Sequence, residues 1–310
     1  YGPAKNSCSG KYQYGSFCKR CPSYGETIRC GEYGFASGGK GSNQAFAVAR
    51  LGGSATFVGR IGDDDYGKKV TASLRNAGVN TDYLVVDPDT QTGLALMPIE
   101  PGTGRYVCYV AMGGNDRLCP EDVKKAMDAQ AFDMVLMQLE MPLETIYGTI
   151  ELAKERHIPV FLDAGPAIDI SLERLKGLFI ISPNEAETFG LTGICPDTDA
   201  NAFKAARLLY EKTAPTYVIL KLGDRGILLY DGKESLRIPC FKVDAVDSTA
   251  AGDTFGAALA ISLCKGLSMM DAIRYAQAAA GICVSRTGAQ SSIPTPEEIC
   301  RFLDSHPNLN

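Results

Sequence analysis

The 310-residue chain is 45% hydrophobic with a formal net charge of −5, which suffices for one large α/β domain or two small ones. It contains no long basic run, so nucleic acid and anionic membranes are disfavoured as main partners. No apolar stretch approaches the roughly 20 residues that a membrane-spanning helix needs. The N-terminus lacks the apolar core of a secretory signal, and two histidines without an HExxH motif disfavour a zinc hydrolase.

The first 21 residues differ in composition from everything that follows. Residues 6–21, NSCSGKYQYGSFCKRC, contain three cysteines and almost no aliphatic side chain. With the next cysteine they would form a four-thiolate zinc site or a disulfide-bonded arm, but the spacing C-x9-C-x2-C-x8-C has only one CxxC pair. The four cysteines concerned are Cys8, Cys18, Cys21 and Cys30. The other seven lie in apolar contexts and are expected to be buried, reduced thiols of a cytoplasmic protein.

From residue 40 onward, helical and strand patterns alternate. Residues 40–52 place Ala, Phe and Val at helical spacing, and the pair Gly52-Gly53 ends the predicted helix. A strand is predicted over 54–62, and an amphipathic helix opened by aspartates over 63–78. Apolar runs typical of buried strands then recur between further helices. The predicted strands are 132–140, 158–165, 178–184 and 216–223, and the predicted helices are 143–157, 201–212, 252–267 and 268–286.

This alternation predicts the fold class. Nearly continuous Val, Ile and Leu runs separated by helices indicate an α/β fold, with a mainly parallel sheet covered on both faces. Residues 92–114 depart from the pattern, because their apolar residues alternate around a Pro-Gly-Thr-Gly turn and predict a hairpin. A hairpin inserted in a parallel series suggests a lid over an active site, and an ordinary edge hairpin fits the same pattern.

Ligands of open α/β sheets bind where strands end and helices begin, and three such junctions stand out. In DSTAAGDTFGAA, residues 247–258, small residues lead into a helix whose first N–H groups are free to face an anion. Asp253 in its first turn is poorly placed to hold a phosphate but well placed to take a proton from a hydroxyl that attacks it. An ordinary acidic helix cap would show the same carboxylate.

The other two junctions offer substrate and metal contacts. SGGKGSNQA fits the front of a P-loop, but Gly41 stands where Ser or Thr should bind magnesium. A glycine turn that holds a polyhydroxylated substrate with Lys40 and Asn43 fits better. SPNEAE follows a buried strand and presents Asn184 and Glu187 on one side of a helical turn. These side chains would hold magnesium through water, or simply cap the helix.

Six segments, in this order and spacing, resemble the ribokinase (PfkB) family of sugar kinases: GGKGSNQA, MQLE, SPNEAE, KLGDRG, DSTAAGDTF and RTGAQSSIP. The resemblance covers residues 22 to about 304, and the first and fifth segments are highly specific. It implies a three-layer αβα sandwich, with residues 1–310 as a single ribokinase-like domain and a small β-lid from about 24–36 and 92–113. It also implies transfer of the ATP γ-phosphate to a sugar primary hydroxyl, with D-ribose as the first candidate, and we expect a homodimer that forms through the lid.

The family's functional positions carry over residue by residue. The resemblance implies that Asp253 is the base, and that the N–H groups of Ala250, Ala251 and Gly252 form an anion hole for the phosphoryl group. The implied sugar-binding residues are Gly39, Lys40, Gly41, Asn43, Glu140 and Asp253. The implied nucleotide-binding residues are Asn184, Lys221, Gly223, Asp224, Gly226, Gly252 and Gln277. Glu187 matches the position associated with magnesium, through water. A monovalent cation, potassium, would bind, mostly through backbone carbonyls, at Asp247, Thr249, Cys283, Arg286, Gly288 and Ser292.

The N-terminal segment departs from the family. There an apolar first strand runs into Gly-Ser-x-Asn-x-Asp, whose Asn and Asp hold the sugar; here residues 1–21 contain no apolar run and no aspartate. One allowed back-translation of residues 5–21, read with a leading adenine deleted, encodes KILVVGSINMDLFVKDA, a buried strand followed by the missing motif. We therefore interpret residues 5–21 as an out-of-frame reading of a normal first strand, with the frame restored near Pro22. The nucleotide sequence tests this interpretation.

The segment also bears on activity. If the protein does carry it, the sheet would lose a strand and the sugar two polar contacts, and we expect weak or no activity. Alternative functions are a deoxyribose, fructose or nucleoside kinase, the last with Tyr106 or Tyr109 as an aromatic shelf near the lid. A catalytically impaired sugar- or nucleotide-binding homologue is the rival from a different class. The cofactors expected of the kinase are ATP, Mg2+ and K+.

Overall fold

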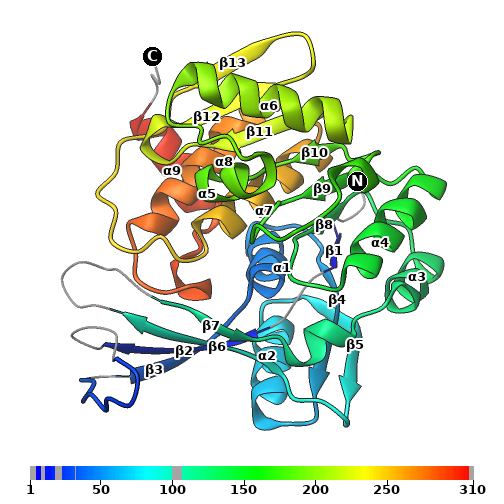
Figure 1. Ribbon diagram of the computed structural model, residues 1–310, viewed down its shortest axis with the longest axis vertical. Helices are drawn as coiled ribbons and strands as arrows, with labels where there is room; N and C mark the ends of the chain where they lie inside the picture. The colour runs from blue at the N-terminus through cyan, green and yellow to red at the C-terminus, as the bar shows by residue number, and fades with distance from the viewer. Residues whose placement is uncertain (1–4, 8–10, 18–22, 32, 100–106, 307–310) are drawn as a thin grey trace.

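The computed structural model describes residues 5–7, 11–17, 23–31, 33–99 and 107–306. Within these residues two β-sheets organise the chain (Figure 1), a nine-stranded sheet in the order β13-β12-β11-β10-β9-β8-β1-β4-β5 and a four-stranded sheet in the order β3-β2-β6-β7. The strands of the larger sheet are β1 (Lys5–Ser7), β4 (Thr56–Gly62), β5 (Asn80–Asp87), β8 (Val135–Met137), β9 (Val160–Leu162), β10 (Ile180–Ile181), β11 (Tyr217–Lys221), β12 (Ile227–Tyr230) and β13 (Ser235–Ile238). Those of the smaller sheet are β2 (Lys11–Phe17), β3 (Tyr33–Gly38), β6 (Gly93–Ile99) and β7 (Tyr109–Ala111).

The larger sheet is parallel from β11 to β5, and β12 and β13 extend one edge in antiparallel fashion. Helices cover both of its faces (Figure 1). Neighbouring residues of a strand point to opposite faces, so Phe57 and Leu136 join one buried cluster while Val58 and Met137 join the other. The first cluster lies against α1, α7 and α8, and the second against α3, α4 and α6. This arrangement confirms the predicted sheet with two covered faces.

Several helices begin at a capping side chain. Side-chain oxygens of Asp64, Thr198 and Ser268 each accept a hydrogen bond from a first-turn N–H group, as expected of N-cap residues. The α-helices are α1 (Lys40–Arg50), α2 (Asp65–Asn76), α3 (Pro120–Ala129), α4 (Leu143–Glu155), α5 (Glu185–Thr192), α6 (Asp199–Thr213), α7 (Ala251–Cys264), α8 (Met269–Val284) and α9 (Pro296–Ser305). Short 3-10 helices are η1 (Gly113–Arg117), η2 (Leu172–Leu175), η3 (Gly223–Arg225) and η4 (Gln290–Ser292).

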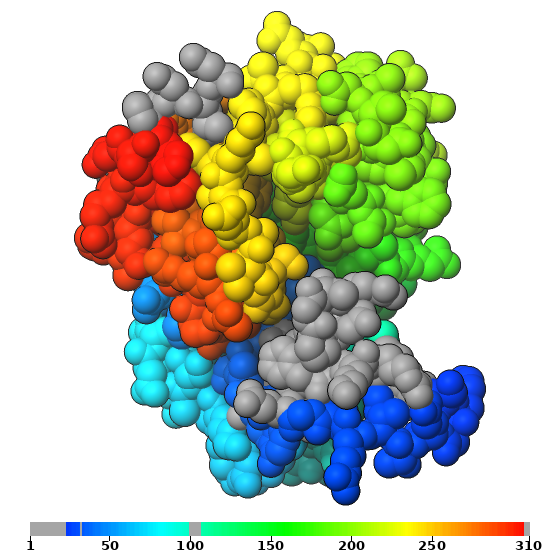
Figure 2. Space-filling model, turned by 90° about the vertical axis from the view of Figure 1, so that its left-hand side faces the viewer, coloured from blue at the N-terminus to red at the C-terminus, as the bar shows by residue number. Residues whose placement is uncertain are grey.

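The predicted hairpin is confirmed, because β6 and β7 pair antiparallel. The turn between them, including Tyr106, lies outside the described residues. Residues 11–17, which the sequence sets apart as aberrant, form β2 between β3 and β6. Figure 2 shows the blue segment that includes β3 extending beyond the body of the molecule. Several large apolar side chains of this sheet are exposed: Tyr33, Phe35, Leu96, Tyr109 and Val110.

The position of the first strand is filled. Lys5–Ser7 pair in parallel with β4 on one side and β8 on the other, with Asn6 in register with both Phe57 and Leu136. The expectation that the sheet would lose a strand is therefore not met by the backbone. Phe57 and Leu136, the register partners of Asn6, are fully buried, so a polar residue type occupies a strand position that suits an apolar one.

The cysteines differ partly from expectation. Seven of the described cysteines are free, as predicted, but of these only Cys283 is buried. Apolar neighbours in the sequence do not determine whether a cysteine side chain faces the core. Cys300, for example, lies on the exposed side of the amphipathic helix α9. Cys30 is disulfide-bonded, so it does not serve as a zinc thiolate, and the other three members of the proposed zinc set lie outside the described residues. In the described part of the chain, no helix is long and apolar enough to cross a membrane.

Candidate active site

The start of α7 has an unusual backbone at the predicted anion hole. Ala250, its N-cap residue, has a left-handed backbone (φ 59°, ψ 8°), which costs a non-glycine residue about 1–3 kcal/mol and is typical of functional sites. The N–H of Ala251 donates a hydrogen bond to the Ser248 carbonyl oxygen at 3.3 Å, and the Thr254 N–H donates the first intrahelical bond to the Ala250 carbonyl oxygen. The N–H groups of the turn between them have no acceptor within the helix. Small residues and glycine leave space for a ligand to approach them.

Asp253 stands in this first turn with one oxygen fixed and one free. Its side chain is buried, Oδ2 accepts a hydrogen bond from Asn43 Nδ2 at 2.9 Å, and Oδ1 has no partner. Burial raises the pKa of Asp253 to about 6, with Lys40 opposing the rise and Asp163 adding to it. A carboxylate with a free oxygen and a pKa just below neutrality suits a general base.

Helix α1 carries the predicted sugar-binding residues to the same place. Gly39, its N-cap residue, has φ 89° and admits the sharp entry of the chain, and Gly41 and Asn43 are buried behind it. Lys40 Nζ lies 4.0 Å from Asp163 Oδ2 and 3.8 Å from Glu187 Oε1. Burial alone would lower the pKa of Lys40, but these carboxylates and Asp253 raise it above the ordinary lysine value, so the ammonium stays charged. Half-buried Glu140, just beyond β8, adds its charge to the same field.

Asp163 belongs to the site and was missed in the sequence. It follows β9, and only 1% of its side chain is exposed. Oδ2 accepts a hydrogen bond from Gln44 Nε2 at 3.0 Å, while Oδ1 forms a short ion pair with Lys221 Nζ. The available signal was the segment FLDAG, an aspartate directly after a buried strand, which is the same kind of position that drew attention to Glu140.

Asn184 and Glu187 lie together as predicted, and they also form a helix cap. Asn184 Oδ1 accepts from the Glu187 N–H at 2.8 Å, and Glu187 Oε2 accepts from the Asn184 N–H at 2.8 Å. Glu187 is buried, and its other oxygen faces Lys40. Gly165 permits this approach, because a Cβ there would collide with Glu187 Oε1. Magnesium binding and capping are thus compatible, since each uses a different oxygen.

The predicted nucleotide-binding residues line the neighbouring strand ends. Lys221 closes β11 and forms a parallel bridge with Asn184, and Gly223 and Asp224 follow in η3. Gly226 has φ 81°, and a Cβ there would collide with the Ile238 carbonyl oxygen. On α8, Gln277 is buried and neither atom of its amide has a hydrogen-bond partner. A buried amide in this state needs a ligand or water to satisfy it.

Five of the six predicted cation residues converge. Asp247 Oδ1 accepts from the Thr249 N–H at 2.9 Å, and Oδ2 accepts from the Gly288 N–H at 2.9 Å. Burial works against ionisation, but these hydrogen bonds hold the pKa of Asp247 below its usual value. The Cys283 thiol lies 3.0 Å from the Ser292 hydroxyl and 3.6 Å from the Thr249 carbonyl oxygen. Oxygen atoms of Asp247, Thr249 and Ser292 therefore lie near the Cys283 thiol, and hard cations prefer oxygen ligands.

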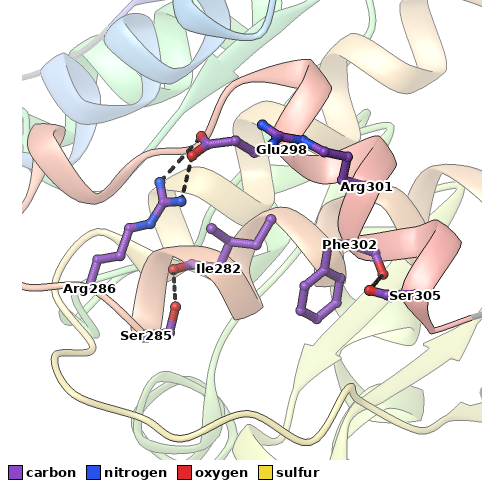
Figure 3. A pocket seen from close by; sticks show the side chains of 7 residues that line it. All are labelled: Ile282, Ser285, Arg286, Glu298, Arg301, Phe302 and Ser305. Atoms are coloured by element: carbon purple, nitrogen blue, oxygen red, sulfur yellow. Dashed lines mark hydrogen bonds and ion pairs between the residues drawn. The ribbon is translucent and has the colours of Figure 1, made fainter.

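The sixth residue, Arg286, directs its side chain elsewhere. Figure 3 shows its guanidinium paired with the Glu298 carboxylate, at 2.6 and 3.3 Å, across a groove between α8 and α9. The groove is lined by Ile282, Ser285, Arg286, Glu298, Arg301, Phe302 and Ser305 and contains no other predicted site residue. Arg286 would therefore serve a cation only through its backbone.

Comparison with known proteins agrees with this geometry. The pfkB family of carbohydrate kinases matches residues 5–296. The chain is 38% identical to a ribokinase of Haemophilus influenzae, over 90% of this chain and 91% of that one. It is 32% identical to a deoxyribokinase of Salmonella typhimurium, over 93% and 94% of the two chains. The solved structure of Arabidopsis thaliana ribokinase with ribose and ATP superposes with a TM-score of 0.88 at 30% identity, covering 98% of this chain and 99% of that one.

Proposed function

This chain belongs to the pfkB family of carbohydrate kinases, and from that premise we propose that it transfers the γ-phosphate of ATP to the primary hydroxyl of D-ribose. The Haemophilus relative is a ribokinase, and the Arabidopsis structure holds ribose and ATP. The Salmonella deoxyribokinase makes deoxyribose the second candidate acceptor. The products are a sugar 5-phosphate and ADP.

The observation that carries the proposal is the free oxygen of Asp253 beside the amino end of α7. Asp253 Oδ1 takes the proton of the sugar hydroxyl while that hydroxyl oxygen bonds to the γ-phosphorus. The bond from the γ-phosphorus to its bridging oxygen breaks, and ADP leaves with the electron pair. Backbone N–H groups of Ala250 and Gly252 stabilise the charge on the phosphoryl oxygens, and the Ala251 N–H joins them by exchanging the Ser248 carbonyl oxygen for a phosphoryl oxygen.

The remaining site residues divide between the two substrates. We assign the sugar to Gly39, Lys40, Gly41, Asn43 and Glu140. Asn43 hydrogen bonds to Asp253, and the charges of Lys40 and Glu140 act on its pKa. We assign the nucleotide to Asn184, Lys221, Gly223, Asp224, Gly226 and Gln277. The unpaired Gln277 amide supports this division, because a nucleotide would supply the donor and acceptor that it lacks.

The residues present fit the expected cations. Glu187 would hold magnesium through water, and the ion would neutralise charge on the phosphates of ATP. Potassium would bind at Asp247, Thr249, Cys283, Gly288 and Ser292 and at the Arg286 carbonyl, where the lowered pKa of Asp247 keeps a negative charge available.

The smaller sheet is assigned two roles. It would close over the sugar as a lid, and it would form a homodimer interface, which its exposed apolar side chains support. Seven of the described cysteines are free and only Cys30 is disulfide-bonded among them; this majority supports a reducing compartment, and we propose the cytoplasm.

The test is a coupled assay of ADP release over a panel of sugars and nucleosides. Ribose is expected to give the highest kcat/KM, with deoxyribose next. Asp253→Asn is expected to abolish turnover and leave nucleotide binding nearly intact, measured by calorimetry. Retained turnover in Asp253→Asn would remove Asp253 as the base, and nucleotide binding without sugar-stimulated ADP release in the parent chain would favour an impaired binding homologue.

A further inference from the structure

A buried chain of polar side chains runs through the site, and no role assigned above explains it. Asp163 stands at its centre and accepts a hydrogen bond at Oδ2 from Gln44 Nε2, 3.0 Å away. Gln44 Oε1 in turn accepts from Gln138 Nε2, and both glutamines are fully buried. Two buried amides therefore fix the orientation of the Asp163 carboxylate and leave Oδ1 for another partner.

That partner is Lys221. Its Nζ makes a short ion pair with Asp163 Oδ1, and only 15% of the lysine side chain is exposed. The same ammonium lies 3.7 Å from the position of a Cβ on Gly252, so it stands against the first turn of α7. Lys40 lies 4.0 Å from Asp163 and has Glu187 as an additional counter-ion at 3.8 Å. Asp163 thus restrains the Lys221 ammonium more tightly than it restrains the Lys40 ammonium.

We propose that Asp163 is a positioning residue that holds the Lys221 ammonium beside Gly252, where the ammonium stabilises the charge of the phosphoryl group during its transfer. A lysine side chain is flexible, so fixing it before the substrates arrive removes an entropic cost from the transition state. The pairing also neutralises Asp163, which would otherwise repel a phosphate. This inference rests on the proposed placement of the transferred phosphoryl group at α7.

The experiment is a double-mutant cycle with Asp163→Asn, Lys221→Met and the combined variant. Each single change is expected to lower kcat on the order of 100-fold, as loss of one transition-state contact does, with the KM for the sugar nearly unchanged. The combined variant is expected to lose no more kcat than the less active of the two single variants, because both changes break the same contact. Lys221→Arg, which keeps the charge, is expected to recover part of kcat.

Two controls separate position from folding. The exposed ion pair of Lys212 Nζ and Glu173 Oε1, at 2.8 Å, is the matched pair, and Lys212→Met with Glu173→Gln is expected to leave kcat unchanged. Gln44→Leu removes the hydrogen bond to Asp163 but keeps the ion pair, so a smaller loss of kcat at constant sugar KM is expected. Urea unfolding of each variant shows whether it is folded. If Asp163→Asn does not fold, the kcat of Gln44→Leu is the test of the inference.

Five results would overturn the inference. Losses that multiply in the combined variant would show that the two residues act independently. An increase in sugar KM that matches the fall in kcat would place the effect on ground-state binding. Recovery of Asp163→Asn by excess Mg2+ would mean that Asp163 acts on the metal instead. If Asp253→Asn keeps turnover, the placement of the phosphoryl group fails; if it abolishes turnover while the Asp163 and Lys221 variants stay fully active, only this inference fails.

Discussion

Restoring an apolar first strand is expected to stabilise the protein and to increase its activity. The change replaces residues 6–21 by ILVVGSINMDLFVKDA, the product of the shifted frame. Of the three residues in β1, it puts Ile at position 6, in register with Phe57 and Leu136, and Leu at position 7, in register with Val58. These three neighbours are at most 3% exposed, so the new side chains would stand between covered faces.

The magnitude follows from this burial. Full burial of one Ile or Leu side chain contributes about 1.5–3 kcal/mol, so the two positions together are expected to raise the free energy of unfolding by roughly 3–6 kcal/mol. Urea unfolding of the parent and restored chains measures the difference. A restored chain with Ala at the Asn and Asp of the GSINMD segment is the matched control, and it is expected to keep the stability gain while losing sugar affinity.

The result that refutes this reasoning is a stability gain below about 1 kcal/mol, less than one buried side chain would give. It would mean that the polar segment already fills its place in the sheet. Ordinary ribose kinase activity in the parent chain would likewise contradict the view that residues 5–21 replace a sugar-binding strand. Sequencing the gene decides the origin of the segment separately, because a single-base slip must open the GSINMD reading.

Two further predictions concern the base and the nucleotide loop. Burial raises the pKa of Asp253 to about 6, and only the ionised form accepts a proton, so kcat/KM is expected to fall as pH drops through 6. Asp163→Asn is expected to move the midpoint of this pH profile lower, because the Asp163 charge raises the pKa of Asp253. A profile that stays flat down to pH 5 would contradict the assignment of Asp253 as the base. Gly226→Ala is expected to reduce the free energy of unfolding by at least about 1 kcal/mol more than Gly52→Ala does. Both glycines have positive φ, but only at Gly226 would a new Cβ collide with backbone atoms. Equal losses in urea unfolding would show that the loop can move to make room for the Cβ.

Local patterns predicted local structure well. The helix over 252–267 was expected from its apolar spacing and is observed as α7, Ala251–Cys264, with Asp253 in its first turn. The buried strand expected over 132–140 is shorter at both ends, and the observed strand covers Val135–Met137. No strand was predicted over residues 11–17, whose composition is polar, yet they pair with β3 and β6. Pairing between distant segments overrides composition there.

Asp163 shows what local patterns cannot supply. Its partners Gln44 and Lys221 are 119 and 58 residues away in sequence, so their convergence depends on the order of strands in the sheet. An aspartate after a strand is also an ordinary turn residue, and nothing in FLDAG distinguishes the two roles. Glu187 is the reverse case. The segment SPNEAE predicted both its role as a helix cap and its role as a magnesium-associated residue, and both are compatible with the structure.

The charges of the site explain why the base has an intermediate pKa. Asp253 is buried, which favours its protonated form, and the nearby carboxylates of Asp163 and Glu140 act in the same direction. Lys40 and the Asn43 amide oppose them, so the pKa rises only to about 6. At neutral pH most molecules then carry an ionised base, and that base binds a proton more strongly than an exposed aspartate does. Asp163 contributes to this balance through its negative charge, which raises the pKa of Asp253 even though Asp163 is paired with Lys221.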